Sequence, residues 1–421
     1  MAKENSVISG LRELPGHITV KTITQGIVTG IAGWGFALML YAYGNACGWP
    51  AETVTSWIFA CWGMGCINGI FLALKYKMPI AGAWSISGAA VAVSGVQAGL
   101  TLPQLCTGYL MAGIIVLLLG LSGVITKIIR YLPMPIVMGM TAGCLFKFAT
   151  DIVKFIAEWS MNVSTGDNAV LLGIALAAVV VWAVFTKLKI PAVPPVLAAL
   201  VVVIAGVMMF GLYDASMLEG LKWSGPKIPG YSLEGLGNVF VSITLPLSML
   251  VIGAENTQAV GVLKGQGYDP PVKTMTIVSG LGGMITSVFG GHNANIAGPM
   301  TAMTASPDSG PKEDRYAATV ICMLFTSLVA IFASIVVPFL NTLPVNLIYI
   351  VAGLSLLGVI LGSLQDAFSG KKFQLSAFVA FVVALSGVSF FSIGPAFWAL
   401  FIGTAVAAVV ETEDLKELIR K

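Results

Sequence analysis

One carboxylate inside an apolar segment is the residue of this chain with the clearest capacity for chemistry. Glu255 lies in the sequence LVIGAENTQ, residues 250–258, within a long apolar stretch. An ionisable group at such a place costs about 2.5–3.5 kcal/mol or more in a bilayer, so it should face a cavity or a partner. Burial favours the neutral, proton-carrying form of a carboxyl group. We predict that Glu255 carries a proton and that Asn256 lies in the same site; a carboxylate that only bonds a neighbouring helix is the alternative.

A second polar group opens the short segment 290–305. His292, Asn293 and Asn295 lie in the sequence GGHNANIAGPMTA, which begins at residue 290. Backbone that enters a half-helix presents free N–H groups and the positive end of a dipole, which attract anionic or polar ligands. We therefore predict that the three side chains bind substrate, with His292 donating to it or pairing with Glu255. The alternatives are that His292 holds the broken backbone and that Asn295 is an N-cap.

A third group lies in the short segment 79–96. Trp84, Ser85 and Ser87 belong to the sequence PIAGAWSISGAA, which begins at residue 79. The hydroxyls can cap a half-helix or bind a ligand, and the indole offers a stacking face to a flat ring, although Trp is also a common interface anchor. Two interrupted segments at corresponding places in two halves of a membrane protein indicate a transporter's binding site. We expect the two half-helices to meet at the centre.

The elements around these residues are those of a polytopic membrane protein. Hydrophobic residues make up 57% and charged residues 10% of the 421 residues, with a mean hydropathy of +0.92 and a net charge of +3. Apolar stretches of about 17–25 residues are long enough to span a bilayer as helices. They are expected at 20–46, 53–74, 104–126, 133–157, 168–186, 191–211, 238–263, 271–289, 316–338, 345–365, 372–389 and 394–411. The two short segments raise the number of crossings to fourteen in an all-α fold.

The distribution of positive charge supports this topology. With the N-terminus in the cytoplasm and alternating crossings, 22 Lys and Arg residues are divided so that all but Lys147, Lys154, Lys222 and Lys227 lie inside. This is the bias that membrane proteins show. Seven crossings per half place the second half upside down, which is an inverted repeat. We predict a cytoplasmic tail at 1–18, repeats at 19–211 and 238–411, an outer connection at 212–237 and a cytoplasmic tail at 412–421.

Several functional classes have no support in the sequence. The six cysteines and two histidines have no metal-ligand spacing. No HExxH, GxSxG or P-loop occurs, so an enzyme or an ATP-driven pump is not expected, nor a cofactor or a nucleic-acid partner. Lys147, Asp151 and Lys154 are interpreted as a salt-bridged helix face. Asp366, near Lys371 and Lys372, is interpreted as an inner membrane boundary. Transport driven by a gradient remains.

From about residue 20 to 410 the chain resembles the benzoate transporter family, the benzoate–proton symporters. The matching stretches are Ala83-Trp84-Ser85 with Gly88-Ala89-Ala90, Gly267-Tyr268 with Pro270-Pro271, Phe289-Gly290-Gly291-His292, Ala352-Gly353-Leu354 and Ala396-Phe397-Trp398. The resemblance implies the seven-plus-seven inverted-repeat fold shared with nucleobase–cation symporters and sulfate permeases. It also implies a core domain, from the first four crossings of each repeat, that moves against a gate domain from the last three.

Departures from the family pattern gather at the expected site. Ile86-Ser87-Gly88 stands where the family has Ser-Pro-Gly or Thr-Pro-Gly, and the segment 255–259 reads Glu-Asn-Thr-Gln-Ala in place of Gln-Asn-x-Pro-Gly. Asn293 replaces a small Ala. Each change adds hydrogen-bonding capacity, so the sequence predicts a substrate more polar than benzoate. The carboxylate of Glu255 at this place is similar to that of the nucleobase symporters.

Together these observations predict a proton-coupled symporter of the inner (plasma) membrane, with both termini cytoplasmic. Its partners would be the lipid bilayer, a proton and a small aromatic or organic anion that resembles benzoate. Glu255 would couple the proton. The substrate would be bound by Trp84, Ser85, Ser87, Glu255, Asn256, His292, Asn293 and Asn295. A nucleobase symporter for a uracil-like or xanthine-like substrate, and an anion exchanger or channel, are the alternatives; the sequence leaves monomer and homodimer open.

Overall fold

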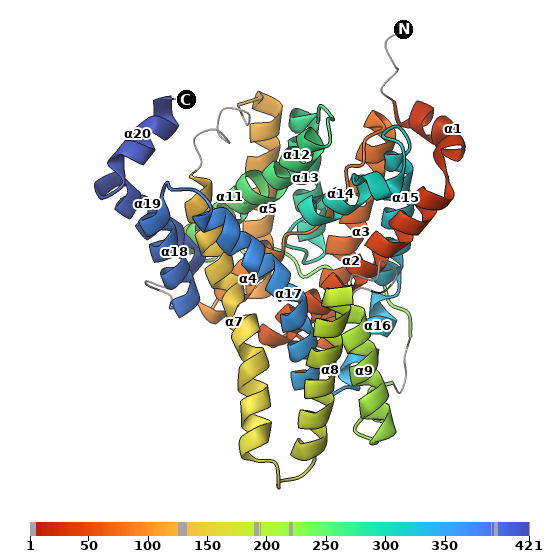
Figure 1. The fold of residues 1–421 in the computed structure, drawn as a ribbon. Coiled ribbons are helices and arrows are strands. Elements are labelled where there is room, and N and C mark those ends of the chain that lie inside the picture. Colours follow the sequence, from red (N-terminus) through yellow and green to blue (C-terminus); the bar gives the residue numbers. More distant parts are fainter. Residues whose placement is uncertain are drawn as a thin grey trace.

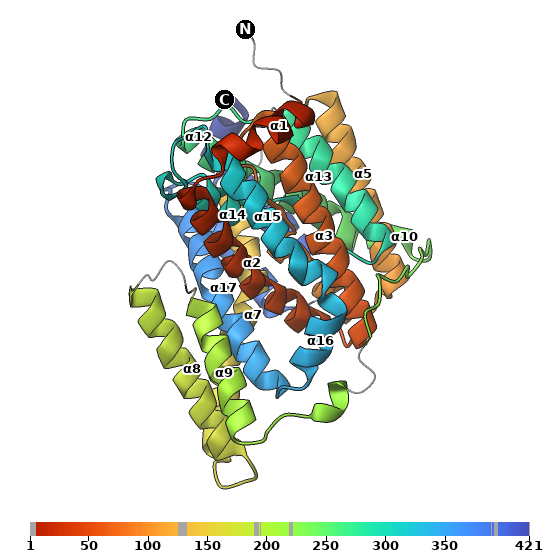
Figure 2. The same cartoon turned by 90° about the vertical axis from the view of Figure 1, so that its right-hand side faces the viewer.

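The protein folds into two bundles of helices with a short crossed-strand centre between them. This computed structural model describes residues 6–124, 133–188, 193, 195–218, 222–388, 390 and 395–420. The first bundle packs α5 against α13, and α15 against both α2 and α3 (Figure 2). Its helices are α2 (Val20–Ala46), α3 (Ala51–Tyr76), α5 (Leu102–Ser122), α13 (Val272–Val288) and α15 (Arg315–Ile331).

The second bundle packs α7 against α17 and α18, and α18 against α19. A pair formed by α8 and α9 stands at one side of the molecule (Figure 2). The helices of this bundle are α7 (Met134–Met161), α8 (Asn168–Leu188), α9 (Pro195–Met209), α17 (Val345–Phe368), α18 (Gln374–Ser386) and α19 (Pro395–Val409). The predicted spans 191–211 and 394–411 begin at residues outside the described ranges.

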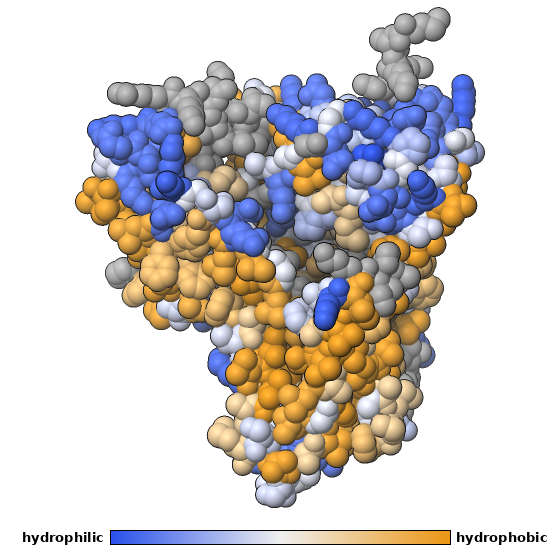
Figure 3. Space-filling model, in the orientation of Figure 1, coloured by the Kyte–Doolittle hydropathy of each residue, from blue (hydrophilic) through white to orange (hydrophobic). Residues whose placement is uncertain are grey.

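The helices confirm a predominantly helical membrane protein. In the described part of the chain, 6 helical runs are long and apolar enough to cross a bilayer, or 7 with the bent α15–α16 pair. The shorter apolar helices α4, α9, α13, α18 and α19 correspond to further predicted spans. Polar residues gather at the end where both termini lie, and apolar side chains cover the flanks (Figure 3).

At the centre, two strands of two residues cross. β1 (Gly82–Ala83) pairs antiparallel with β2 (Asn295–Ile296), with Gly82 opposite Ile296 and Ala83 opposite Asn295. The half-helices α4 (Ile86–Gln97) and α14 (Gly298–Thr304) follow the strands. Both predicted half-helices are present, but each begins later than predicted because the first residues of each segment are extended.

Glycines allow the crossed strands to lie against α3. A Cβ on Gly82 would meet the carbonyl oxygen of Gly65 at 2.1 Å and the backbone nitrogen of Gly69 at 2.7 Å. Real Cβ atoms do not approach backbone this closely, because interiors are packed to van der Waals contact. The backbones of strand and helix therefore touch directly at this point.

The predicted span at 238–263 is present as one helical run, Leu236–Lys264, but its winding is irregular. The segment alternates between α-helical pieces, α10 (Leu236–Val239), α11 (Leu245–Met249) and α12 (Thr257–Gly265), and π-helical turns at Phe240–Thr244 and Leu250–Asn256. Pro246 has no N–H to give to the preceding turn, and the Leu245 N–H bonds the Phe240 carbonyl, five residues back. Wider π turns occur often at functional sites, and Glu255 lies in the second.

The predicted helix at 316–338 is also broken. The axis bends by 61° between α15 and α16 (Ala333–Asn341). The outer connection supplies the missing bonds: the Trp223 indole donates to the Ile331 carbonyl at 2.8 Å, and the Ser224 N–H donates to the Ser334 hydroxyl at 3.2 Å. The bend is therefore stabilised by a segment more than a hundred residues away in the chain.

Each chain end carries a helix that braces one bundle (Figure 1). α1 (Val7–His17) lies on the first bundle, where Glu13 pairs with Lys77 at 2.5 Å and His17 with Asp314 at 2.6 Å. α20 (Thr412–Arg420) follows α19 in the second bundle. Glu411, just before it, accepts hydrogen bonds from the backbone N–H groups at the start of α18. The predicted tails at 1–18 and 412–421 thus contain ordered helices, while residues 1–5 and 421 lie outside the described ranges.

Candidate functional site

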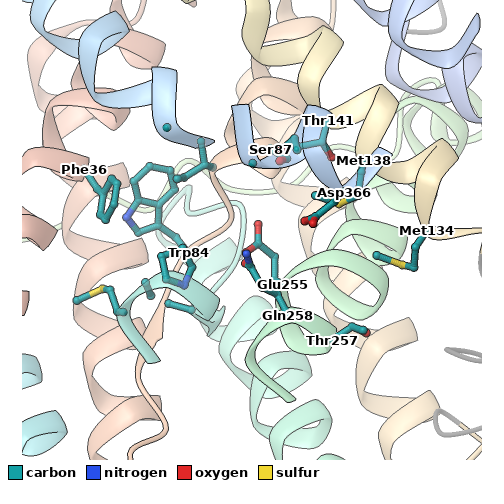
Figure 4. Close-up of a pocket in the computed structure, with 18 of the residues that line it drawn as sticks. Phe36, Trp84, Ser87, Met134, Met138, Thr141, Glu255, Thr257, Gln258 and Asp366 are labelled. Atoms are coloured by element: carbon teal, nitrogen blue, oxygen red, sulfur yellow. The ribbon is translucent and has the colours of Figure 1, made fainter. Parts of the chain in front are cut away.

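A cavity of about 540 Å³ lies beside the crossed strands, with walls from both bundles (Figure 4). This size lies within the range of small-molecule sites. The first residue of α7 and the last turns of α17 border the cavity. Both of these helix ends lie on the side of the molecule that also has the two chain termini (Figure 1). The lining residues are Phe36, Trp62, Ala83, Trp84, Ile86, Ser87, Met134, Met138, Thr141, Glu255, Thr257, Gln258, Ala297, Pro299, Met300, Gly358, Gly362, Ser363 and Asp366.

Ser85 is fully buried, and besides the helical bond from the Ala89 N–H to its carbonyl it makes four hydrogen bonds. Its hydroxyl accepts from the Gly88 N–H at 2.9 Å and donates to Glu255 Oε1 at 2.7 Å. Ser85 therefore caps α4, which was the alternative to the predicted substrate binding, and it lies outside the cavity lining. Its backbone N–H donates to Asn293 Oδ1 at 2.9 Å, and its carbonyl accepts from His292 Nε2 at 2.9 Å. One serine thus links the start of α4, the second short segment and the carboxylate.

Glu255 is placed where a cavity carboxylate was predicted. Its side chain is half-buried, lines the cavity and is held by the Ser85 hydroxyl on one oxygen. α4 begins at Ile86, directly after Ser85. The positive end of the α4 dipole therefore lies beside the Glu255 carboxylate. Glu255 can therefore accept or release a proton while one oxygen stays fixed. Figure 4 shows its carboxyl group turned toward the cavity.

His292 lies behind the cavity and is bonded on both ring nitrogens. The Trp57 indole N–H can only donate, and it lies 3.0 Å from His292 Nδ1, so this nitrogen is the acceptor. Nε2 therefore carries the proton that is donated to the Ser85 carbonyl. With no ring nitrogen left over, His292 holds the broken backbone, which was the alternative interpretation, and does not pair with Glu255.

The three predicted asparagines also lie outside the cavity lining. Asn293 Oδ1 accepts from Ser85, and Asn256 Oδ1 accepts from the Ser279 hydroxyl at 3.1 Å and from the Ile296 N–H at 3.4 Å. Asn295 is not an N-cap, because α14 is capped by the backbone of Ala297 without a side-chain bond. Asn256 and Asn293 connect the two short segments to their neighbours, whereas the Asn295 side chain bonds only the carbonyl of the adjacent Ile296, at 3.5 Å, within the described residues.

Sequence reasoning missed the wall contributed by the second bundle. On α17, Gly358, Gly362 and Asp366 are four residues apart and so share one helix face, which borders the cavity. Met134, Met138 and Thr141 form a similar stripe on α7. This spacing was the available signal, but Asp366 was interpreted as a membrane boundary because lysines follow it.

Gln258 was also missed. It lies one turn beyond Glu255 and is exposed into the cavity, against the first residue of α14, where a Cβ on Gly298 would meet its Oε1 at 2.3 Å. Gln258 thus adds an amide donor and acceptor beside the carboxylate.

The charges of the lining are all negative. Among the described residues, the lining has two carboxylates, Glu255 and Asp366, and no Lys, Arg or His. Three of its side chains hold a buried polar atom without a hydrogen-bond partner in the described part of the chain: the indole N–H groups of Trp62 and Trp84 and the Thr141 hydroxyl. Aromatic faces and unpaired donors therefore surround the acidic groups.

No cluster of metal-binding side chains occurs in the described ranges. A search of these residues finds no group of three or more His, Cys, Asp or Glu that could hold a metal ion. The six cysteines are free thiols, most of them buried.

Comparison with known proteins agrees with this architecture. Residues 16–409 match the family model described as benzoate membrane transport protein. The inner membrane protein YdcO of Escherichia coli (strain K12) is 29% identical over 383 residues, 89% of this chain and 93% of the relative. The benzoate membrane transport protein of Acinetobacter baylyi is 25% identical over 353 residues, 84% of this chain and 85% of the relative.

Solved structures share the fold. The transmembrane domain of the cyanobacterial bicarbonate transporter BicA superposes with a TM-score of 0.61 at 15% identity, covering 91% of this chain and 97% of that one. The structure of SLC26A9 superposes with a TM-score of 0.65 at 14% identity, covering 96% and 68%.

Proposed function

We propose, from the premise that this chain belongs to the benzoate membrane transport protein family, that it carries a small aromatic carboxylate together with a proton. The family is one of membrane transporters and not of enzymes. A small-molecule substrate and the lipid bilayer are therefore its partners.

The negative lining of the cavity carries the proposal. An aromatic acid that enters as an anion meets Glu255 and Asp366 and no cationic side chain in the described lining. Two carboxylates in contact repel, whereas one proton shared between them gives a strong, charge-assisted hydrogen bond. Binding of the anion at Glu255 therefore requires a proton, and the two leave together.

The surroundings of Glu255 fit an aromatic acid. Trp84 and Phe36 give the ring apolar faces, and the start of α4 places a positive dipole end near the carboxylate group. The methionines of the lining, Met134, Met138 and Met300, adapt to the outline of a ring.

We place the chain in the inner membrane with both termini in the cytoplasm and with fourteen segments in two inverted repeats, 19–211 and 238–411. The packing of the two halves supports the repeats. α5 of the first half lies against the first π turn and α13 of the second half, and α15 of the second half lies in the corresponding way against α2 and α3 of the first half. In this orientation the cavity reaches toward the cytoplasm, which is an inward-facing state.

The test is uptake of labelled benzoate into proteoliposomes under an inward proton gradient. We expect accumulation that disappears when the gradient is removed. Glu255→Gln keeps the size and polarity of the side chain but binds no proton, so it should abolish accumulation and spare exchange. Glu234→Gln, on the exposed outer connection, is the matched control. A Glu255→Gln protein that still concentrates benzoate would overturn the coupling role.

A nucleobase symporter is the second candidate. Glu255 and Gln258 together present carboxylate and amide groups to one cavity, a set that can bond the edge of a flat heteroaromatic ring. Proton-driven uptake of labelled uracil or xanthine, in the absence of benzoate uptake, would favour this substrate class over aromatic acids.

A further inference from the structure

We propose that Asp366 selects aromatic acids that carry an O–H or N–H donor on the ring opposite the carboxylate, such as 4-hydroxybenzoate and 4-aminobenzoate. This inference rests on the proposed function, since it assumes that the carboxylate end of the substrate is bound at Glu255. It assigns to the second bundle a role in recognition that complements the proton site of the first.

The two carboxylates come from different elements and line one cavity. Glu255 belongs to the π turn between α11 and α12, and Asp366 to the last turns of α17. Figure 4 shows both carboxyl groups turned to the same space, with Ser87 and Thr141 beyond them. A molecule bound in this space can contact both acidic groups.

The face of α17 leaves room for the ring. A Cβ built on Gly358 or on Gly362 would meet no atom within 4 Å, although both residues line the cavity. A ring whose carboxylate is bound at Glu255 can therefore lie against this glycine face. The substituent opposite the carboxylate then points along α17, toward Asp366.

Asp366 is available for such a contact. None of the ion pairs in the described part of the chain includes it, and the nearby Lys372 is paired with Glu417. Its side chain is exposed at the border of the cavity. An ionised carboxylate accepts hydrogen bonds and donates none. It attracts a phenol or an aromatic amine and repels any group that offers only lone pairs.

The second bundle therefore contributes to affinity only when the substrate has a donor. Benzoate itself has none at that end and leaves Asp366 facing the cavity unpaired. A hydrogen bond to a charged group is among the stronger ones in proteins. We expect a 4-hydroxy or 4-amino group to tighten binding by about tenfold relative to benzoate.

The test measures binding of four ligands to the purified full-length chain in lipid nanodiscs by calorimetry. The ligands are benzoate, 4-hydroxybenzoate, 4-aminobenzoate and 4-methoxybenzoate, which has a substituent of similar size that accepts but cannot donate. We expect the hydroxy and amino acids to bind about tenfold more tightly than benzoate, and the methoxy acid to bind no more tightly than benzoate.

Variants assign the effect to one residue. Asp366→Ala should remove the advantage of the donor groups and raise the affinity for benzoate, because it removes a repelling charge. Asp366→Asn keeps an acceptor without the charge and should retain part of the advantage. Asp269→Asn, at an exposed position outside the cavity, should leave all four affinities as in the wild type.

The outcomes separate the two proposals. If 4-methoxybenzoate binds as tightly as 4-hydroxybenzoate, or if the advantage survives Asp366→Ala, the role of Asp366 is wrong while transport of aromatic acids stands. If a folded protein binds none of the four acids, the proposed function itself is wrong, and this inference is wrong with it.

Discussion

The two crossed-strand segments have the same backbone plan but different roles. β1–α4 turns Trp84 and Ser87 toward the cavity and holds Glu255 through Ser85. β2–α14 contributes Ala297, Pro299 and Met300 to the cavity, while His292 and Asn293 bond back to Ser85. The first segment provides chemistry, and the second mainly fixes the first in position.

This difference shows that polar residues near a helix break do not all serve the ligand. A broken backbone exposes N–H and carbonyl groups that have to be bonded inside a membrane. His292, Asn293 and Asn256 satisfy such groups, and only the remaining polar side chains can face a substrate. The following substitutions test this division, from the largest expected effect to the smallest.

Gly82→Val should prevent folding, because both segments depend on the contact between β1 and α3. The new side chain would have to displace backbone atoms of Gly65 and Gly69, which cannot retreat without breaking α3. We expect loss of folded protein in size-exclusion chromatography after membrane extraction. Gly173→Val on α8, where a Cβ meets no atom within 4 Å, is the control. A folded Gly82→Val protein would contradict the direct backbone contact.

His292→Ala should reduce stability more than binding. It leaves the Trp57 indole N–H unpaired in a buried place, which costs about 1–3 kcal/mol. It also removes one of the two hydrogen bonds of the Ser85 carbonyl, which keeps the bond from the Ala89 N–H. The measurement is thermal unfolding in detergent, with substrate affinity determined well below the transition. Normal stability with lost binding would instead make His292 a substrate ligand and reverse the division of roles.

Ser85→Ala and Asn293→Ala should separate the two segments. Ser85→Ala removes the cap of α4, at about 1 kcal/mol, and also the bond to Glu255, so transport should fall further than stability does. Asn293→Ala removes only the acceptor of the Ser85 N–H, so stability and transport should fall together. Proton-driven uptake is compared with the unfolding temperature of each variant. If the loss of uptake relative to the loss of stability is the same in the two variants, Ser85 has no role beyond holding the two segments in place.

Ser87→Ala should give the smallest change. Ser87 is 4% exposed and borders the cavity, so its hydroxyl is placed for a substrate rather than for the fold. We expect less than about tenfold loss of affinity, measured by calorimetry, with the unfolding temperature unchanged. Ser94→Ala on the same helix, whose hydroxyl bonds the Ala90 carbonyl, is the control for substrate affinity. A large loss of stability in Ser87→Ala would place it with the bracing residues.

Local sequence indicated a possible cap for α4 and the main carboxylate. Ser85 at the start of a glycine-rich helix and Glu255 in an apolar segment are informative because their cost is local: an uncapped helix end and a charge in lipid. The roles of His292 and Asn293 depend on partners some two hundred residues away, Ser85 and Trp57. No local pattern distinguishes such bracing from ligand binding.

The two departures from regular helices have the same origin. The bend after Ile331 is stabilised by Trp223 from the outer connection, and hydropathy contains no sign of this partner. The π turns around Pro246 change which side chains share a face. Hydropathy predicts that a segment is apolar but not how its backbone bonds are distributed.

The helices at the two chain ends are suitable attachment sites for dyes that report movement of one bundle relative to the other. α1 is held on the first bundle through Glu13 and His17, and the start of α20 is held on the second through Glu411. A donor dye on one helix and an acceptor dye on the other would each move with their own bundle. Energy transfer between them would then report displacement of one bundle against the other in single molecules, without any change to the cavity.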